Sequence, residues 1–189
     1  MLKFQTNYLN KEWKETEIKL KAGKNIPIYK TGIENSKKRI SVFEPNVNVL
    51  KFAMVPILIT ERTFRKGIEF DTLFIASGER LLKNDYIKSM IVNLDIVKNG
   101  TPKIKFTPRY PVTHYLAEST DMVLSHQWEN PLNYSYWDAL YLNFPLVHNA
   151  EMIKDMGYYY PDFNAELGSV QLINAIENHD ALAQEYNKK

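Results

Sequence analysis

The chain contains no cysteine among its 189 residues. This absence excludes disulfide bonds, thiolate metal sites and thiol catalysis, and it is typical of intracellular proteins. The sequence also has no stretch approaching the roughly 20 apolar residues of a membrane-spanning helix, and its N-terminus has no apolar run of signal-peptide length. We therefore expect a cytoplasmic protein without a membrane span.

The motifs of several common enzyme classes are missing as well. There is no Gly-x-Gly-x-x-Gly, no Gly-x-x-x-x-Gly-Lys-Ser/Thr, no Gly-x-Ser-x-Gly and no His-Glu-x-x-His. The four histidines are widely separated, so we expect no metal site and no other cofactor. Glu69 and Asp71 form an acid-x-acid pair, but this pair lies at the entrance of a predicted strand and would be opposite the ligand edge of a sheet.

Length and charge predict one domain with an extension. Hydrophobic residues make up 44% of the chain, enough for one core. Residues 1–39 hold ten Lys and Arg against four Glu, a charge of +6, which leaves −4 for the remainder of a chain with net charge +2. We interpret residues 1–38 as a basic arm or linker remnant and residues 39–189 as the domain. Acidic residues interrupt the basic ones and no nucleic-acid motif is present, so we do not expect nucleic acid as a partner.

Apolar runs alternate with helical periodicity from residue 40 onward. The runs predict strands at residues 39–43, 71–76, 103–106, 121–124 and 145–148. The periodicity predicts helices over residues 49–65, 81–97, 112–118, 132–142 and 165–186, with a kink or restart at Pro56 in the first of them. Strands that alternate with helices and are apolar throughout are typical of parallel sheets covered on both faces. The predicted fold is therefore α/β, a Rossmann-like parallel sheet flanked by helices.

Polar and aromatic residues follow each predicted strand. In such sheets the ligand lies beyond the carboxyl ends of the strands, where the strand order switches direction. The residues that follow the strands are Glu44, Asn46 and Asn48; Ser77 and Gly78; Arg109 and Tyr110; Ser125, His126, Gln127, Trp128, Glu129 and Asn130; and His148 and Asn149. Their concentration at one edge predicts a binding site there.

The parts of this edge suit a nucleoside diphosphate. Residues 127–133 lead into a predicted helix, whose first N–H groups could receive a phosphate. Trp128 or Tyr110 could stack on a base, and Asp138 could accept hydrogen bonds from a ribose diol. We expect His126 and His148 to be hydrogen-bonded near the site rather than catalytic.

Residues 103–149 resemble the nucleotide-sugar-binding, C-terminal half of GT-B glycosyltransferases. That family has a Ser-x-x-Glu loop, then a helix with a second Glu followed by Ala, and a Pro seven residues after that Glu. Here Asp138-Ala139 takes the place of Glu-Ala, and Pro145 lies at the matching distance. The strings SHQWENPLNY, PLVHN and ISVFEPNVNVLKF are still more similar to a group of uncharacterised GT-B-like proteins.

The resemblance implies roles for particular residues. Glu129 or Asn130 would contact the donor sugar, because the two acids of the family are eight positions apart whereas Glu129 and Asp138 are nine apart. Asp138 would bind the ribose, residues 131–133 the diphosphate, and Lys51 the phosphates. The full set of candidate substrate-binding residues is Asn46, Lys51, Arg109, Tyr110, His126, Trp128, Glu129, Asn130, Asn133 and Asp138.

Simpler structural interpretations remain open for three of these residues. Asp138 could be an ordinary exposed helix residue, Glu129 a charge at a helix N-terminus, and Lys51 a solvated lysine on an amphipathic helix.

Two classes of function are compatible with the sequence. The first is the donor-binding half of a glycosyltransferase, which would move a sugar from a nucleotide diphosphate sugar to an acceptor. GT-B enzymes have two Rossmann-like domains, so a second chain or a homodimer would then supply the acceptor half. The alternative is a non-catalytic module that binds a nucleotide or nucleotide sugar or serves assembly.

Overall fold

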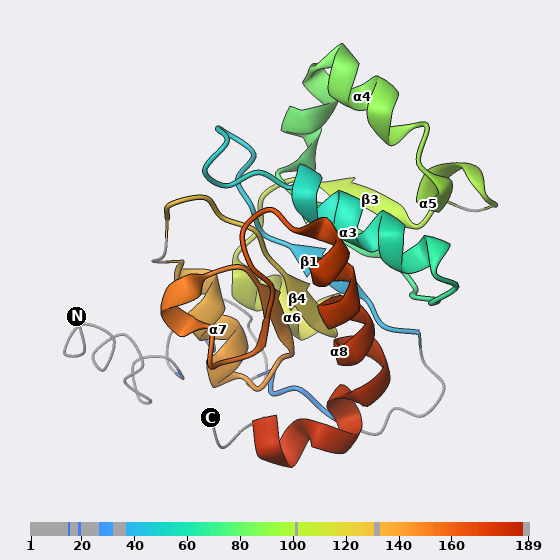
Figure 1. Cartoon of the computed structure of the whole chain (residues 1–189). Helices are drawn as coiled ribbons and strands as arrows, with labels where there is room; N and C mark the ends of the chain where they lie inside the picture. Colours follow the sequence, from blue (N-terminus) through green and yellow to red (C-terminus); the bar gives the residue numbers. More distant parts are fainter. Residues whose placement is uncertain are drawn as a thin grey trace.

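Six parallel strands form the sheet at the centre of the computed structural model, in the order β3-β2-β1-β4-β5-β6 (Figure 1). The structure describes residues 15, 19, 27–31, 37–100, 102–130 and 133–186, so most of the predicted arm 1–38 and residues 131–132 lie outside the described residues. The strands are β1 (Ile40–Val42), β2 (Leu73–Ala76), β3 (Ile104–Thr107), β4 (Met122–Leu124), β5 (Leu146–His148) and β6 (Tyr158–Tyr159).

The strands form where the sequence predicts buried apolar runs. All three residues of β1, of β4 and of β5 are buried, as expected for central strands covered on both faces. The parallel register pairs Ile40 with Leu73 on one side and with Met122 on the other. The prediction of an α/β, Rossmann-like parallel sheet is therefore confirmed, with β6 as a sixth strand at one edge.

Helices cover both faces of the sheet. On one face α3 (Met54–Arg65) packs against the long α8 (Ala165–Tyr186), and on the other α6 (Val112–Glu118) packs against α7 (Tyr134–Tyr141). Figure 1 shows α3 and α8 on one side of the sheet and α7 on the other. Each pair covers its own apolar core, one around Ile57, Ile75 and Leu172 and one around Tyr136 and Leu146. No helix in the described part of the chain is long and apolar enough to cross a membrane.

Two predicted helices differ from the structure. The helix predicted over residues 49–65 begins at Met54, so Pro56 lies in its first turn, where a missing N–H costs little, and causes no restart. The helix predicted over residues 81–97 is divided into η1 (Gly78–Lys83), α4 (Asp85–Ile91) and α5 (Asp95–Lys98). Asn84 ends the first of these and caps the second, because its side chain accepts hydrogen bonds from the first-turn N–H groups of α4.

Part of the predicted arm contacts the domain. The Tyr29 N–H donates to the carbonyl of Leu142 at 2.9 Å, and the Tyr29 hydroxyl donates to Asp180 at 2.6 Å. Lys38 is buried and forms an ion pair with the same carboxylate at 2.8 Å. These contacts join Tyr29 to the end of α7, and Tyr29 and Lys38 to α8.

Candidate functional site

The strand order places the switch point of the sheet between β1 and β4. From β1 the chain continues to β2 and β3 on one side, and from β4 to β5 and β6 on the other. The loops that follow β1 and β4 therefore leave the same edge toward helices on opposite faces of the sheet. This position, which we call the β1–β4 crevice, is where such sheets bind ligands. Three hydrogen bonds join these loops: Trp128 N–H donates to the Leu50 carbonyl at 2.8 Å, and Glu44 Oε1 accepts from the Ser125 hydroxyl and, at 3.1 Å, from His126 N–H.

Asn46 shapes the loop after β1. It lies in the left-handed region, with φ of 54°, and it is buried. Its amide nitrogen donates to the carbonyls of Glu44 at 2.9 Å and Ala76 at 3.3 Å, and its amide oxygen accepts from Ala53 N–H at 2.8 Å. The side chain of Asn46 thus connects β1, β2 and the start of α3.

We expect Asn46→Ala to lower the free energy of unfolding by about 2 kcal/mol. The substitution removes three hydrogen bonds and places alanine where a left-handed backbone is unfavourable. Chemical denaturation measures the change. Asn48→Ala is the matched control, because Asn48 is exposed and accepts one hydrogen bond, from Leu50 N–H at 3.1 Å. An equal loss of stability in both variants would contradict the prediction.

Lys51 lies in the loop after β1, close enough to Glu44 for its charge to act on that group. It is half-buried and precedes α3, so it is not a residue of an amphipathic helix as the simpler interpretation supposed. Its charge acts on the buried carboxyl of Glu44 and lowers the pKa of that group. Lys51 forms no ion pair within the part of the chain that the structure describes, so its ammonium group is available to an anion.

A buried polar cluster lies beneath the two loops. Ser125 donates a hydrogen bond to Glu44 Oε1 and lies 3.1 Å from the hydroxyl of Tyr136. The Tyr160 hydroxyl donates to the Ser125 carbonyl at 3.0 Å and lies 3.1 Å from His126 Nδ1. Burial lowers the pKa of His126 to about 4, so its ring is neutral near pH 7. His126 is therefore a hydrogen-bonded residue of the cluster rather than an exposed base.

Asn149 holds the loop after β4 against the segment after β6. Its amide oxygen accepts from Gln127 N–H at 2.8 Å, and its amide nitrogen donates to the carbonyls of Gln127 at 2.7 Å and Asp162 at 3.0 Å. Next to this clamp Trp128 and Phe163 present exposed rings, with centroids 6.0 Å apart. The clamp thus fixes the backbone that presents both aromatic rings.

The loop after β4 carries the two candidates for the donor sugar. Glu129 is exposed and has φ of 49°, and it precedes α7 by several residues, so it is not a charge in the first helical turn. Asn130 is half-buried, and its N–H donates to the Gln127 side chain. Both residues lie beside the crevice, whereas the predicted diphosphate turn lies partly in residues 131–132, outside the described residues.

Helix α7 begins at the crevice. Asn133 is its N-cap and accepts from the Ser135 hydroxyl at 2.9 Å. Asp138 lies on its second turn and is only 9% exposed, which excludes the interpretation as an exposed helix residue. A carboxylate buried at this position needs polar partners, as the cost of burying an unpaired charge is large.

Arg109 and Tyr110 are exposed in the segment between β3 and α6. The ring of Tyr110 lies 6.0 Å from that of Tyr115, whose ring lies 5.3 Å from that of Phe43 at the end of β1. Through these rings Tyr110 is connected to the switch point, although β3 is an edge strand. The candidates therefore gather around the carboxyl edge, with Lys51, His126, Trp128, Glu129, Asn130 and Asn133 beside the β1–β4 crevice and Tyr110 on the α6 side.

The sequence did not single out Glu44, Asn149 and Phe163. The available clue was that Glu44 and Asn149 follow predicted strands. Their burial and their long-range partners could not be predicted from the sequence. No local pattern distinguished Phe163 from a core aromatic residue.

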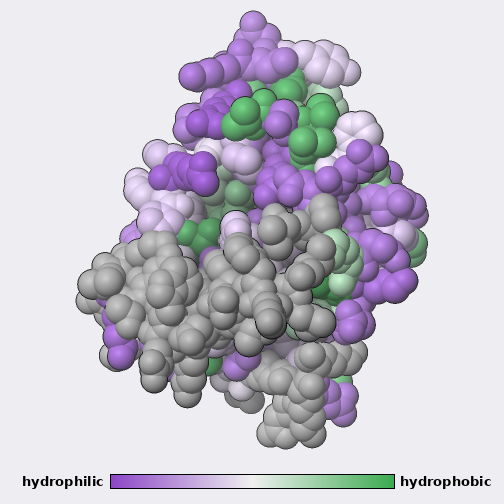
Figure 2. Space-filling model, turned by 90° about the vertical axis from the view of Figure 1, so that its left-hand side faces the viewer, coloured by the Kyte–Doolittle hydropathy of each residue, from purple (hydrophilic) through white to green (hydrophobic). Residues whose placement is uncertain are grey.

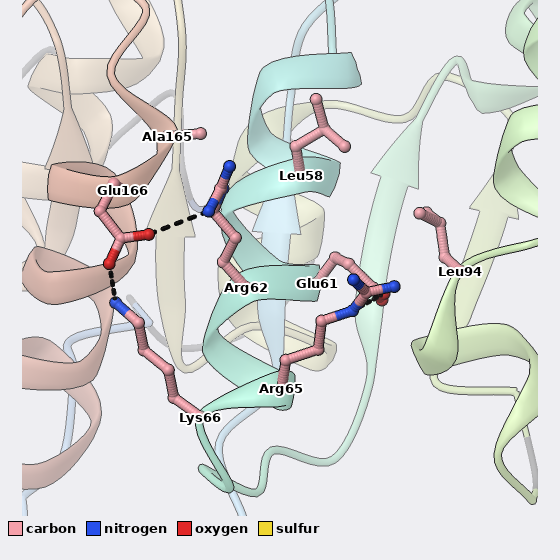
Figure 3. A pocket seen from close by; sticks show the side chains of 8 residues that line it. All are labelled: Leu58, Glu61, Arg62, Arg65, Lys66, Leu94, Ala165 and Glu166. Carbon is pink, nitrogen blue, oxygen red and sulfur yellow. Dashed lines mark hydrogen bonds and ion pairs between the residues drawn. The ribbon is translucent and has the colours of Figure 1, made fainter.

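A separate cavity of about 350 Å³ lies between α3 and α8 (Figure 3). Its charged residues are paired with one another: Arg62 and Lys66 with Glu166 at 3.0 and 2.5 Å, and Arg65 with Glu61 at 2.7 Å. It borders the C-terminal half of α3, away from the loop between β1 and α3. The pairs with Glu166 join the C-terminal end of α3 to α8, the pair with Glu61 lies within α3, and together they leave no cation of the cavity lining free for a ligand.

Comparison with solved structures finds glycosyltransferases of the same fold. The chain is similar to S. aureus TarM, a mutant of which was solved with Fondaparinux, alpha-GlcNAc-glycerol and UDP, at 16% identity and a TM-score of 0.62, covering 85% of this chain and 33% of that one. It is similar to the pneumococcal O-GlcNAc transferase GtfA, solved with UDP and GlcNAc, at 12% identity and a TM-score of 0.56, covering 87% and 35%. A glycosyltransferase from Rickettsia africae ESF-5 aligns at 10% identity and a TM-score of 0.59, covering 96% and 48%.

These similarities show the fold, an α/β Rossmann-like sheet that matches GT-B glycosyltransferase half-domains. The chain spans between a third and a half of the length of these enzymes. No curated protein matches its sequence. A family model described as "Protein of unknown function (DUF2827)" matches residues 5–189. Because that match covers nearly the whole chain, the protein belongs to this DUF2827 family.

Proposed function

We propose that the chain is the nucleotide-sugar-binding half of a GT-B type glycosyltransferase. The observation that carries the proposal is the β1–β4 crevice, where an available lysine, the start of α7 and exposed aromatic residues meet at the switch point of a GT-B-like sheet. A nucleoside diphosphate needs these groups: a cation and N–H groups for the phosphates, and an aromatic ring for the base.

In this proposal, particular residues bind each part of the nucleotide-sugar donor. Lys51 and the N-terminus of α7 at Asn133 bind the diphosphate, and Asp138 binds the ribose hydroxyls. The base lies on the Tyr110 side, with Arg109 close to it. The sugar then extends toward Glu129 and Asn130, beside Trp128. Asn46 and His126 hold the two loops in place, and no metal ion or other cofactor is required.

The acceptor half comes from outside the segment described. The chain spans only part of the length of similar enzymes. In this proposal a second chain or a second copy completes the cleft. One of the similar structures is a complex, GtfA/B, at a TM-score of 0.56. Because nucleotide sugars are cytoplasmic metabolites, we place the activity in the cytoplasm.

Calorimetric titration tests the proposal. UDP, GDP and ADP, and the matching nucleotide sugars, are titrated into the chain. We expect at least one nucleoside diphosphate to bind with a Kd between about 1 μM and 1 mM. If none binds, the donor-domain proposal fails. A monodisperse monomer that binds nucleotide but shows no sugar transfer with any added chain favours the alternative function, a non-catalytic binding module.

We expect Lys51→Ala to weaken binding of UDP about tenfold, because one charge-assisted hydrogen bond to a phosphate contributes roughly 1.4 kcal/mol. Lys88→Ala, on α4, is the control with the same loss of charge at an exposed site remote from the crevice. Equal affinities of the Lys51 variant and the wild type would remove Lys51 from the site.

A further inference from the structure

Glu44 is a buried carboxyl group at the base of the crevice. It is 1% exposed, and its Oε1 accepts hydrogen bonds from the Ser125 hydroxyl and from His126 N–H. Its Oε2 is buried and has no hydrogen-bond partner among the described residues. One oxygen therefore holds the loop after β4 while the other is unoccupied. A proton on Oε2 would break neither contact, so the loop can keep its position with Glu44 neutral or ionised.

The charged groups around Glu44 make its ionisation sensitive to a charged ligand that binds in the crevice. The neighbouring titratable groups are Lys51 from its own loop, His126 from the loop after β4, Tyr136 from α7 and Tyr160 after β6. Burial lowers the pKa of the histidine and raises the pKa of both tyrosines, so these three are neutral near pH 7. Lys51 is the charged group of this set. Burial raises the pKa of Glu44 to about 7, although Ser125, His126 and Lys51 lower it.

We propose that Glu44 is a positioning residue of the nucleotide site that takes up a proton when a diphosphate binds beside Lys51. This inference rests on the proposed function. The bound diphosphate adds negative charge near the carboxylate and engages the ammonium group that favours its ionised form. Both effects favour the neutral acid. Glu44 then continues to hold the loop through Oε1 without repelling the phosphates.

Proton uptake by Glu44 makes the affinity for the ligand depend on pH in a defined direction. If the liganded protein holds the Glu44 proton more tightly than the free protein, affinity is highest below pH 7 and falls as pH rises above it. For a pKa difference of about one unit, affinity decreases three- to tenfold between about pH 6 and pH 8.5, and about half a proton is taken up near pH 7.5. If Glu44 only holds the loop after β4 in place, no proton uptake is expected when the ligand binds.

Titration with UDP-glucose in two buffers of different ionisation enthalpy measures the uptake. Both phosphates of this probe are esterified, so neither titrates near neutral pH. We expect about half a proton per site for the wild type at about pH 7.5 and none for Glu44→Gln, because the amide mimics the neutral acid and keeps an oxygen acceptor. The variant should bind with an affinity independent of pH and close to that of the wild type at about pH 6. Glu69→Gln, at an exposed position, should retain the wild-type uptake.

The outcomes separate this inference from the proposed function. If the wild type and Glu44→Gln bind UDP-glucose with equal proton uptake, the inference is wrong and the nucleotide site stands. If the wild type binds with no uptake at any pH between about 6 and 8.5, the inference is also wrong, and this measurement does not depend on the variant folding. If the wild type binds no nucleotide, the proposed function fails and the inference fails with it.

Discussion

Alanine at position 138 is expected to weaken binding of UDP by between tenfold and a hundredfold. Asp138 lies five residues after the N-cap of α7, about 7.5 Å along the helix at a rise of 1.5 Å per residue. That distance is comparable to the span from a diphosphate to the ribose hydroxyls. A carboxylate that accepts two hydroxyl hydrogen bonds contributes roughly 1.5–3 kcal/mol, and each 1.4 kcal/mol is a factor of ten in Kd.

The buried position of Asp138 requires a control for folding. Because the side chain is 9% exposed, alanine also removes contacts within the domain, and a loss of stability accompanies the loss of binding. Asp138→Asn keeps the size and one acceptor oxygen, so it should fold more stably than the alanine variant and bind UDP with intermediate affinity. Calorimetry is performed on folded protein, verified by circular dichroism. Wild-type affinity in both variants would exclude Asp138 from the ribose site.

Asn149→Ala is expected to lower the free energy of unfolding by about 3–4 kcal/mol. It removes the three hydrogen bonds that join the loop after β4 to the segment after β6, and it leaves the Gln127 backbone groups without these partners in a buried position. Each unsatisfied buried group costs roughly 1–3 kcal/mol. Urea denaturation measures the loss.

Two further variants test the mechanism of this clamp. Asn149→Asp keeps the acceptor for Gln127 N–H but directs a carboxylate oxygen at two carbonyl oxygens, so it should be at least as destabilising as alanine. Asn178→Ala removes an exposed asparagine from α8 and should change stability by less than about 0.5 kcal/mol. If Asn149→Ala costs no more than this control, the hydrogen bonds of Asn149 do not hold the two segments.

Apolar side chains are exposed in the loop after β1. The loop after β1 exposes Val47 and Val49, with 67% and 61% of their surface accessible. This loop lies on the side of Figure 1 that faces the viewer in Figure 2, where hydrophobic residues gather among hydrophilic ones on the upper part of the face. Under the proposed function, another domain would cover these apolar residues in the complete cleft.

The fold was largely predictable from the sequence because its determinants are local. Short apolar runs predicted five strands to within two residues at either end, and residues 112–118 and 165–186 form helices as predicted. The prediction of one helix over residues 81–97, between β2 and β3, was wrong for two different reasons. Asparagine is a preferred N-cap residue, so Asn84 is a local signal for the start of a separate helix. The start of α5 depends on Glu61 of α3, which accepts from Asp95 and Ile96 N–H groups at 2.9 and 3.1 Å, and no local pattern reveals a cap supplied by another helix.

The sequence by itself determined the alternation of strands and helices and the polar character of one sheet edge, because burial of apolar runs and helical periodicity act over a few residues. The tertiary structure decided which of those polar residues meet. Glu44 and His126 are 82 positions apart, and they bond only because parallel pairing brings β1 beside β4. The segments that pack around a side chain set its environment. They leave one oxygen of Glu44 without a hydrogen-bond partner among the described residues, and they place Asn149 where it bonds two other segments.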